Sequence, residues 1–297
     1  MSVPAAYIGI ILIWSTTPLA IQWSSNEVGF LFGITSRMTL GILGGLLVAG
    51  LFNIRLPWHT AARRTYLAAG LGLFLAMTSV YWSAQFIPSG WVSVLFGLAP
   101  IITGAMASFW LAEQALTPAR VTGMLLGLAG LAIMLLGSQQ LGQRAVYGIA
   151  GMVFSVTAYS ASAIAVKRIA ADIPALATTI GALAVTVPLL LLVCILTGEP
   201  LPARVPARAA ISIIYLGLVG SVLGFAMYYY VLSHVAATRV ALITLITPIT
   251  ALLLGHVLNG EALQAEALAG SATILSGLLL FEYGQQAGRW VRDTMIG

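Results

Sequence analysis

The sequence predicts an all-α, polytopic membrane protein with ten transmembrane helices in two inverted five-helix repeats. Three observations lead to this fold class. First, 60% of the 297 residues are hydrophobic and only 7% are charged, whereas about a quarter of the residues of a soluble domain carry a charge. Second, the charges are separated by apolar stretches long enough to cross a bilayer. Third, several residues of the first half of the chain recur in the same order in the second half.

The uncharged stretches set the number of helices. No Asp, Glu, Lys, Arg or His occurs at positions 65–112, 121–143 or 173–198. A bilayer span needs about 20 apolar residues, so each stretch holds one or two spans. With charges, prolines and turn-forming clusters as boundaries, the sequence predicts ten helices, at 4–22, 28–51, 66–86, 90–112, 119–137, 146–166, 174–196, 209–232, 238–258 and 266–283.

The first two predicted helices carry polar groups inside apolar runs. The opening residues, MSVPAAYIGIILIW, lack the basic segment and the cleavage site of a signal peptide, so we expect helix 4–22 to be retained. This helix contains WSTTP, which ends at Pro18. Helix 28–51 contains Arg37, the one ionisable residue predicted inside a span. Burying such a charge costs at least about 2.5 kcal/mol, so Arg37 should face protein or water rather than lipid.

The fourth and fifth helices introduce a proline, a glutamate and closely spaced glycines. In LAPIITGAMASFWLAEQ, Pro100 interrupts an apolar run and Glu113 follows its end. A proline removes a backbone hydrogen bond and bends a helix, so helix 90–112 is expected to be bent or broken there. In the fifth helix, Gly123 and Gly127 favour close packing against another helix.

The second five helices repeat this pattern. In LITPITALLLGHVLNGEA, Pro248 and Glu261 stand 148 positions after Pro100 and Glu113. Further pairs keep the same order along the chain. They are Tyr81 and Trp82 with Tyr229 and Tyr230; Gly123, Gly130 and Gly137 with Gly270, Gly277 and Gly284; and Tyr7, Trp14, Ser15 and Thr17 with Tyr147, Phe154, Ser155 and Thr157.

These pairs divide the chain into two homologous halves, 1–140 and 143–284, followed by a tail, 285–297. Because five is an odd number of spans, the two halves must have opposite orientations. Inverted repeats are typical of secondary transporters, whose substrate site lies between the halves near the middle of the membrane. If the N-terminus is cytoplasmic, nine Lys and Arg residues fall on the inside and three on the outside, which predicts that both termini are cytoplasmic.

Three of these segments carry a resemblance to a known family. WSTTP in the first helix and the paired LAPIITGAMASFWLAEQ and LITPITALLLGHVLNGE segments resemble the EamA family of the drug/metabolite transporter superfamily. The aromatic residues along the candidate path are similar to those of YddG-type bacterial amino-acid exporters. The resemblance implies a ten-helix exporter of aromatic and other amphipathic amino acids in the bacterial inner membrane. Pro18 has no counterpart in the second half, where Ala158 stands, so the halves need not move alike.

Hydroxyl-bearing and aromatic side chains on the pathway helices are the candidate substrate ligands. The hydroxyls could face a cavity or bond within their own helices. The aromatic candidates lie deep in the spans or near the ends of pathway helices, although packing or a membrane-interface position is the alternative. The candidates are Trp14, Ser15, Thr17, Tyr81, Trp82, Ser155, Tyr159, Tyr229 and Thr244.

Three prolines and one tyrosine are candidates for a gating role. Pro18, Pro100 and Pro248 are the candidate hinges. Tyr81 is expected toward the outer end of the third helix and Tyr230 toward the inner end of the eighth. The sequence therefore suggests that two aromatic pairs, Tyr81 with Trp82 and Tyr229 with Tyr230, close opposite gates in turn.

The charged residues are assigned structural or uncertain roles. Arg37 could hold a substrate carboxylate, but we favour snorkelling toward the outer interface or a structural partner. Glu113 and Glu261 are expected to cap the next helix or to pair with an arginine, and His256 to be hydrogen bonded. No acidic residue is predicted at mid-membrane, which favours facilitated diffusion or exchange over proton-coupled drug or metabolite efflux.

Other functions lack their sequence signatures. The motifs G-x-x-x-x-G-K-[ST], H-E-x-x-H and G-x-S-x-G are absent, so we expect no catalytic residue, no cofactor and no bound metal, and we disfavour an enzyme. A carrier of phosphorylated metabolites would need several buried cations, yet the chain has one lysine. The net charge of +5 comes from span ends and loops, which suits lipid and not nucleic acid. The expected partners are a small-molecule substrate and the lipid bilayer. The sequence leaves a channel open as an alternative function, and it leaves a monomeric state open as well.

Overall fold

The structure, a computed structural model, describes residues 2–111, 117–137, 142–241, 243 and 247–296. Within these ranges it contains helices and no strands, which confirms the all-α fold class. Seven helical segments are long and apolar enough to cross a membrane, and three shorter apolar helices complete the ten spans.

Three of the ten spans consist of consecutive shorter segments. The fourth span is α4 and α5, the eighth is α9, η2 and α10, and the ninth is α11 and α12. The first half contains α1 (Val3–Ser25), α2 (Phe30–Leu51), α3 (Thr60–Ser83), α4 (Ser89–Phe96), α5 (Ala99–Trp110) and α6 (Pro118–Gly137). The second half contains α7 (Ala145–Ile169), α8 (Ala175–Thr197), α9 (Ala207–Tyr215), the π-helix η2 (Leu216–Leu223), α10 (Gly224–His234), α11 (Ala237–Ala241), α12 (Thr247–Asn259) and α13 (Ala265–Ile296).

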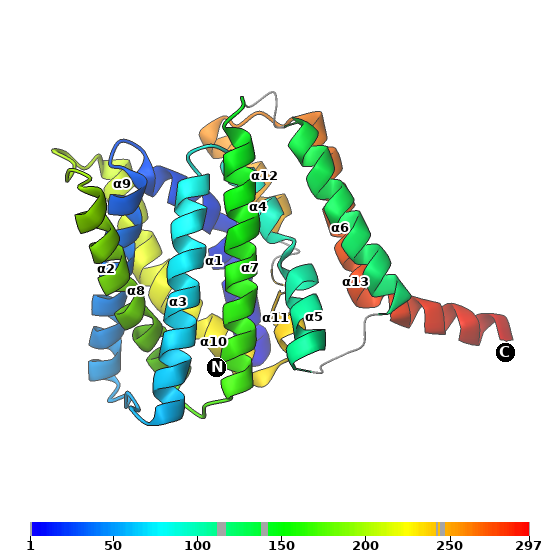
Figure 1. Cartoon of the computed structure of the whole chain (residues 1–297), viewed down its shortest axis with the longest axis horizontal. Helices are drawn as coiled ribbons and strands as arrows, with labels where there is room; N and C mark the ends of the chain where they lie inside the picture. The colour runs from blue at the N-terminus through cyan, green and yellow to red at the C-terminus, as the bar shows by residue number, and fades with distance from the viewer. Residues whose placement is uncertain (1, 112–116, 138–141, 242, 244–246, 297) are drawn as a thin grey trace.

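Successive spans cross the bundle in alternating directions (Figure 1). The N-terminus lies at the lower end of the bundle in Figure 1, which we call the near end, and the opposite end is the far end. Helix α1 runs from the near end to the far end, whereas α7, the first helix of the second half, runs from the far end to the near end. The two halves are therefore inverted relative to each other.

Glycine contacts between α6 and α13 show the relation between the halves at single residues. The two helices lie side by side (Figure 1). A Cβ atom on Gly123 would meet the Gly277 carbonyl, and one on Gly130 would meet the Gly270 carbonyl. Since Gly270 and Gly277 are the repeat partners of Gly123 and Gly130, exchanging the halves converts one contact into the other. A twofold axis between α6 and α13 produces this pattern.

Side-chain hydroxyls join α7 to α3. Ser155 Oγ donates a hydrogen bond to the Ala76 carbonyl at 2.8 Å, and Ser79 Oγ donates to the Gly151 carbonyl at 2.8 Å. Hydrogen bonds of this kind hold membrane helices against one another, because lipid provides no hydrophobic force between helices. Ser155 therefore acts in helix packing.

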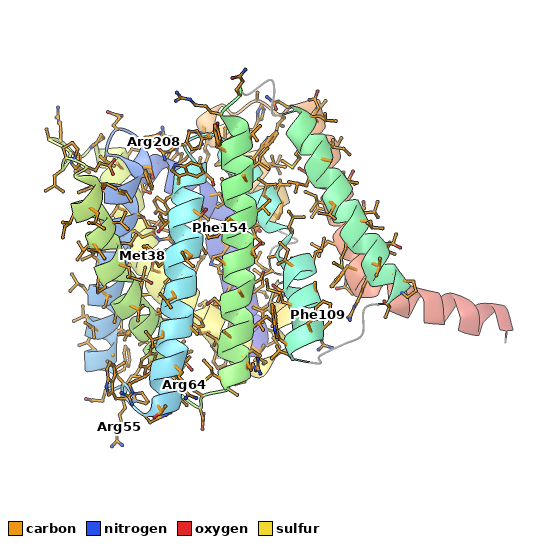
Figure 2. All side chains as sticks on the ribbon, in the orientation of Figure 1. Met38, Arg55, Arg64, Phe109, Phe154 and Arg208 are labelled. Carbon is orange, nitrogen blue, oxygen red and sulfur yellow. The ribbon has the colours of Figure 1, made fainter. Side chains whose placement is uncertain are left out.

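Large apolar side chains cover the outside of the bundle (Figure 2). Phe109 of α5 is 76% exposed and Phe154 of α7 is 53% exposed, so both face the lipid of a membrane-embedded chain. Charged side chains occupy the two ends, with Arg55 and Arg64 at the near end and Arg208 at the far end. This distribution is that of a multi-pass membrane protein.

Pro100 stands at the beginning of a helix. Helix α4 ends at Phe96 and α5 begins at Ala99, with Pro100 in its first turn. The repeat partner Pro248 lies in α12, which is described from Thr247 onward. A proline is tolerated in a first turn because its missing N–H would have no partner there. Pro100 therefore begins a new helix within the fourth span instead of bending a continuous one.

Helix α13 is longer than the sequence predicted. The expected span ended at residue 283, and a separate tail was expected from residue 285, but the helix continues to Ile296. No proline interrupts the sequence after this span, and proline is the residue that most reliably ends a helix.

Candidate functional site

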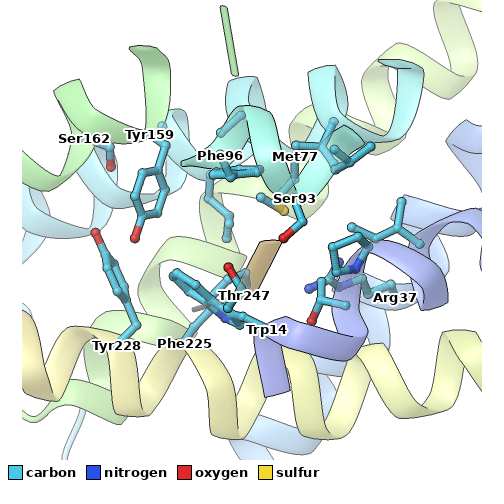
Figure 3. Close-up of a pocket in the computed structure, with 18 of the residues that line it drawn as sticks. Trp14, Arg37, Met77, Ser93, Phe96, Tyr159, Ser162, Phe225, Tyr228 and Thr247 are labelled. Atoms are coloured by element: carbon cyan, nitrogen blue, oxygen red, sulfur yellow. The ribbon is translucent and has the colours of Figure 1, made fainter. Parts of the chain in front are cut away.

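A cavity lined by residues of both halves lies inside the bundle (Figure 3). The cavity has a volume of about 80 Å³, so its walls lie close together. From the first half its lining includes Trp14, Thr17 and Pro18 of α1, Arg37 of α2, Met77 of α3 and Phe96 of α4. From the second half it includes Tyr159 and Ser162 of α7, Phe225, Tyr228 and Tyr229 of α10, and Thr247 of α12.

Three aromatic rings from three helices form one wall, which we call the aromatic cluster. It consists of Trp14, Tyr159 and Tyr228, and its ring centroids are 6.1 Å (Trp14 to Tyr159), 5.6 Å (Trp14 to Tyr228) and 5.4 Å (Tyr159 to Tyr228) apart. Figure 3 shows the Tyr159 and Tyr228 hydroxyls pointing toward each other. Aromatic pairs at such distances attract by about 0.5–1.5 kcal/mol beyond area burial. The cluster offers a bound molecule apolar ring faces together with hydroxyl groups.

In the part of the chain that the structure describes, Arg37 is the one charged residue that lines the cavity. Its side chain is 1% exposed, and its Nε donates a hydrogen bond to Ser221 Oγ at 3.1 Å. The guanidinium carbon lies 5.9 Å from the ring centroids of both Tyr81 and Phe225. The expected snorkelling toward the interface is therefore not observed, because the side chain is held inside the protein by a hydroxyl and two rings.

The π-helix η2 makes room for this arginine. Its wider turn lets the Ser221 hydroxyl donate to the Leu216 carbonyl at 2.9 Å while it accepts from Arg37. At Gly220 a Cβ atom would lie 3.4 Å from Arg37 Nη2, and at Gly217 it would lie 3.1 Å from the Arg37 carbonyl. Short π-helical segments are often found at functional sites. The glycines and the π-helix together bring η2 close to α2.

The hydroxyl candidates from the sequence divide into two groups. Thr17 lines the cavity and also donates to the Ile13 carbonyl at 2.9 Å. Ser15 does not line it, and its Oγ donates to the Ile11 carbonyl at 2.7 Å. Ser155 is likewise absent from the lining because its hydroxyl bonds to α3.

The other candidates lie in three different places. Trp14, Pro18, Tyr159 and Tyr229 line the cavity, whereas Pro100 and Pro248 are buried and are not among the lining residues. Thr244 and Glu113 lie outside the described residues.

The two tyrosines of the gating hypothesis, Tyr81 and Tyr230, lie outside the cavity lining. Tyr81 is fully buried toward the far end, and Tyr230 lies in α10 toward the near end, with its ring centroid 4.3 Å from that of His234. Trp82 is 36% exposed and packs edge-on against Phe86, with a centroid distance of 4.9 Å. Trp82 therefore belongs to the outer surface rather than to the cavity.

Glu261 caps a helix of the opposite half. Its Oε1 accepts hydrogen bonds from the backbone N–H of Ser89 at 3.1 Å and from Ser89 Oγ at 2.6 Å, and its Oε2 accepts from the N–H of Gly90 at 3.2 Å. The first N–H groups of a helix lack internal partners and favour a negative charge. The expected cap on the next helix, α13, is thus found on α4 instead. His256 Nδ1 lies 2.9 Å from the Glu261 carbonyl oxygen.

Several residues that line the cavity were not among the predicted substrate ligands, although the repeat indicates some of them. Phe225 and Tyr228 stand 148 positions after Met77 and Val80, the spacing that relates the repeated prolines, and all four line the cavity. Extending the repeat by one helical turn from Tyr81 and Tyr229 would have found them. Ser93, Ser162 and Thr247 gave no such signal, because isolated hydroxyl residues occur throughout the sequence.

No cluster of three or more His, Cys, Asp and Glu side chains suited to a metal occurs in the part of the chain that the structure describes.

Comparisons with known proteins agree with this architecture. The "Probable terminal-alkyne amino-acid exporter" of Streptantibioticus cattleyicolor is 26% identical over 280 residues, which are 90% of this chain and 92% of that protein. The "Uncharacterized transporter YoaV" of Bacillus subtilis is 21% identical over 92% of this chain and 94% of its own length. The "Probable amino-acid metabolite efflux pump" of Salmonella typhimurium is 33% identical over 82 residues, 28% of this chain and 27% of that protein.

A solved crystal structure has the same fold. It superposes with a TM-score of 0.70 at 22% sequence identity and covers 95% of this chain and 98% of its own. The EamA-like transporter family matches residues 4–136 and again residues 146–283. The chain therefore belongs to the EamA-like transporter family and is a membrane transporter of small molecules.

Proposed function

We propose that this transporter exports small amphipathic metabolites, chiefly aromatic and other neutral amino acids, by alternating access without coupling to an ion gradient. The observation that carries the proposal is the cavity between the two halves, whose walls combine an aromatic cluster, a few hydroxyls and one cation. Pockets of this composition bind amphipathic molecules, with the apolar walls burying the body and the few polar groups fixing its orientation.

The relatives support the substrate class. Two of them are named as an amino-acid exporter and an amino-acid metabolite efflux pump. A bacterial inner membrane and cytoplasmic termini belong to the same proposal. The excess of Lys and Arg in the loops on the same side of the membrane as the N-terminus supports the cytoplasmic termini. If this orientation is right, a reporter enzyme that is active only in the periplasm should show no activity when it is fused to the C-terminus.

Among the described residues that line the cavity there is no acidic side chain, which supports uncoupled transport. Proton-coupled carriers place a titratable carboxylate or histidine on the transport path. Since the described lining contains neither, the substrate gradient or exchange with a second substrate is the driving force that we propose. In this scheme the two access states alternate by rocking of one half against the other.

A counterflow assay tests the proposal. The full-length chain is reconstituted into liposomes and loaded with an unlabelled amino acid, and the uptake of labelled phenylalanine, tryptophan or leucine is measured with and without a pH gradient. Saturable uptake that internal substrate accelerates is expected under both conditions. Strict dependence on the gradient would replace the uncoupled mechanism with proton-coupled efflux, and unsaturable flux would indicate a channel. If no amino acid moves beyond the level of protein-free liposomes, the substrate class is wrong.

A further inference from the structure

Arg37 carries a buried positive charge that the described residues do not neutralise. No ion pair to this side chain is found in the described parts of the chain, and its hydrogen bond there runs from Nε to the neutral hydroxyl of Ser221. The Nη1 atom is buried and has no hydrogen-bond partner among the described residues. An unpaired donor of this kind is unfavourable inside a membrane protein, and a charged one more so.

The position of the charge points to a ligand. Arg37 lines the cavity, and Figure 3 shows it across the cavity from Tyr159 and Tyr228 of the aromatic cluster. The second half has no equivalent cation, since α8, the counterpart of α2, contains no charged residue. The repeat alone therefore does not require an arginine at this position, and the unpaired donor remains available to a molecule in the cavity.

The surroundings of Arg37 restrict how its guanidinium can be used. Tyr81 and Phe225 lie 5.9 Å from the guanidinium carbon, and Ser221 holds Nε. Because Nε is bonded to Ser221 and two rings flank the guanidinium, the Nη groups are the part of Arg37 that a ligand can bind. A planar guanidinium matches a planar carboxylate in size and can donate two parallel hydrogen bonds to it.

We propose that Arg37 binds the carboxylate of the transported molecule and that the apolar body of that molecule extends toward the aromatic cluster. This inference rests on the proposed function and specifies the substrate as a monocarboxylate. One cation balances one negative charge, so doubly charged phosphate esters fit poorly. No acidic side chain of the described residues lines the cavity to hold an ammonium group, although aromatic faces attract cations. The carboxylate is therefore required, and the α-ammonium group is not.

Competition among four related molecules tests the inference on the unmodified chain. L-Phenylalanine, its amide, phenethylamine and 3-phenylpropionate share one aromatic body and differ in the carboxylate and the amine. Each is added as a competitor to phenylalanine counterflow in proteoliposomes. We expect 3-phenylpropionate to compete about as well as phenylalanine, and the amide and the amine to compete at least about tenfold more weakly, as expected for loss of a charge-assisted hydrogen bond.

Two substitutions and a matched control assign the effect to Arg37. Arg37→Met keeps the length of the side chain without its charge, so phenylalanine and its amide should compete equally. Arg37→Lys keeps the charge and should retain a reduced preference for the carboxylate. Arg144→Met removes an exposed arginine just before α7 and should behave as the unmodified protein. Thermal melting of each purified variant reports whether it is folded.

The outcomes separate the two proposals. If phenylalanine is transported but its amide and phenethylamine compete as well as it does, the role of Arg37 is overturned while the transport function stands. Retention of the carboxylate preference by folded Arg37→Met overturns it as well. If no amino acid is transported, the proposed function fails, and the inference that rests on it fails with it. If Arg37→Met does not fold, the competition assay on the unmodified chain and on Arg37→Lys still tests the role of Arg37.

Discussion

Arg37 of α2 and Ser221 of η2 are joined by a 3.1 Å hydrogen bond that connects the first half of the chain to the second. The Ser221 hydroxyl uses its own proton on the Leu216 carbonyl, so its lone pairs face the arginine. This bond fixes the direction in which the guanidinium points, and it makes the orientation of the single cavity charge depend on the π-helical backbone.

Ser221→Ala should weaken the binding of carboxylate substrates without unfolding the protein. The substitution removes the acceptor of Nε, so the guanidinium is no longer held in one orientation. A typical loss of about 0.5–1.5 kcal/mol for one hydrogen bond corresponds to an increase of the half-saturation concentration by about two- to tenfold. Counterflow kinetics measure this change. Ser271→Ala, which removes a buried hydroxyl bonded within α13, is the control and should leave the kinetics unchanged.

Changes at Tyr228 should separate ring packing from hydroxyl chemistry. Its ring contacts Trp14 and Tyr159 in the aromatic cluster and Tyr229 beside it. Tyr228→Phe keeps these contacts and should transport aromatic substrates at near wild-type affinity, whereas Tyr228→Leu should weaken their binding about tenfold or more. Competition with tryptophan and alanine checks the prediction. A loss of equal size for both competitors would contradict it, because alanine has no ring to stack.

Removing the Glu261 carboxylate should destabilise the far end of the bundle. Glu261→Ala leaves the first N–H groups of α4 without their acceptor, and the loss of a helix cap costs about 0.5–2 kcal/mol. Thermal melting in detergent should show a lower transition temperature. Glu261→Gln keeps a neutral acceptor and should fall between Glu261→Ala and the wild type. Equal melting of all three proteins would show that the cap does not contribute to stability.

A larger residue at Gly277 should separate α6 from α13. A Cβ atom there would meet the Gly123 carbonyl and the Gly127 nitrogen, so Gly277→Leu requires the backbones to move apart. We expect poor folding, measured as a loss of the monodisperse peak in size-exclusion chromatography. Gly50→Leu is the matched control, because a Cβ atom at Gly50 has no neighbouring atom within 4 Å.

Tyr81 and Tyr230 offer a test of the proposed gates. Tyr81 is buried near the end of α3, which reaches the far end, and Tyr230 lies in the second half of α10, which runs toward the near end (Figure 1). If they close opposite gates, Tyr81→Ala and Tyr230→Ala should each raise the leak of substrate and reduce the acceleration by internal substrate in the counterflow assay. Unchanged rates and substrate range in both variants would remove the gating hypothesis.

The sequence predicted the fold well because its signals are strong and global. The sequence has ten apolar stretches, and a repeat anchored on Pro100 and Pro248 divides them into two halves of five. Because five is odd, the two halves must be inverted relative to each other. Boundaries were less certain where a span is broken, because Pro100 indicates a disruption without saying whether the helix bends or restarts. The break between α4 and α5 depends on tertiary packing, which a local pattern does not contain.

The candidate site was harder to predict, for reasons that individual residues show. A helix has one face toward the cavity and one toward lipid, and hydrophobic residues occupy both, so Trp82 and Tyr81 could not be assigned to a face from their type. Serine hydroxyls such as Ser15 bond to their own backbone as readily as to a ligand. For Arg37, the short distance to the membrane interface suggested snorkelling. Only the fold shows that Ser221 and two rings hold it inside.

The unmatched arginine also bears on the energies of the transport cycle. In an inverted repeat, the inward-open and outward-open backbones are related by exchanging the two halves. Identical halves would make these two states equal in energy, and an empty carrier would populate both alike. Arg37 and its hydrogen bond to Ser221 have no counterpart in α8, so the exchange moves a charge into a different environment. If the transporter works by alternating access and Arg37 binds the substrate carboxylate, as we propose, the empty transporter should have a preferred resting state, which a bound carboxylate shifts by neutralising that charge.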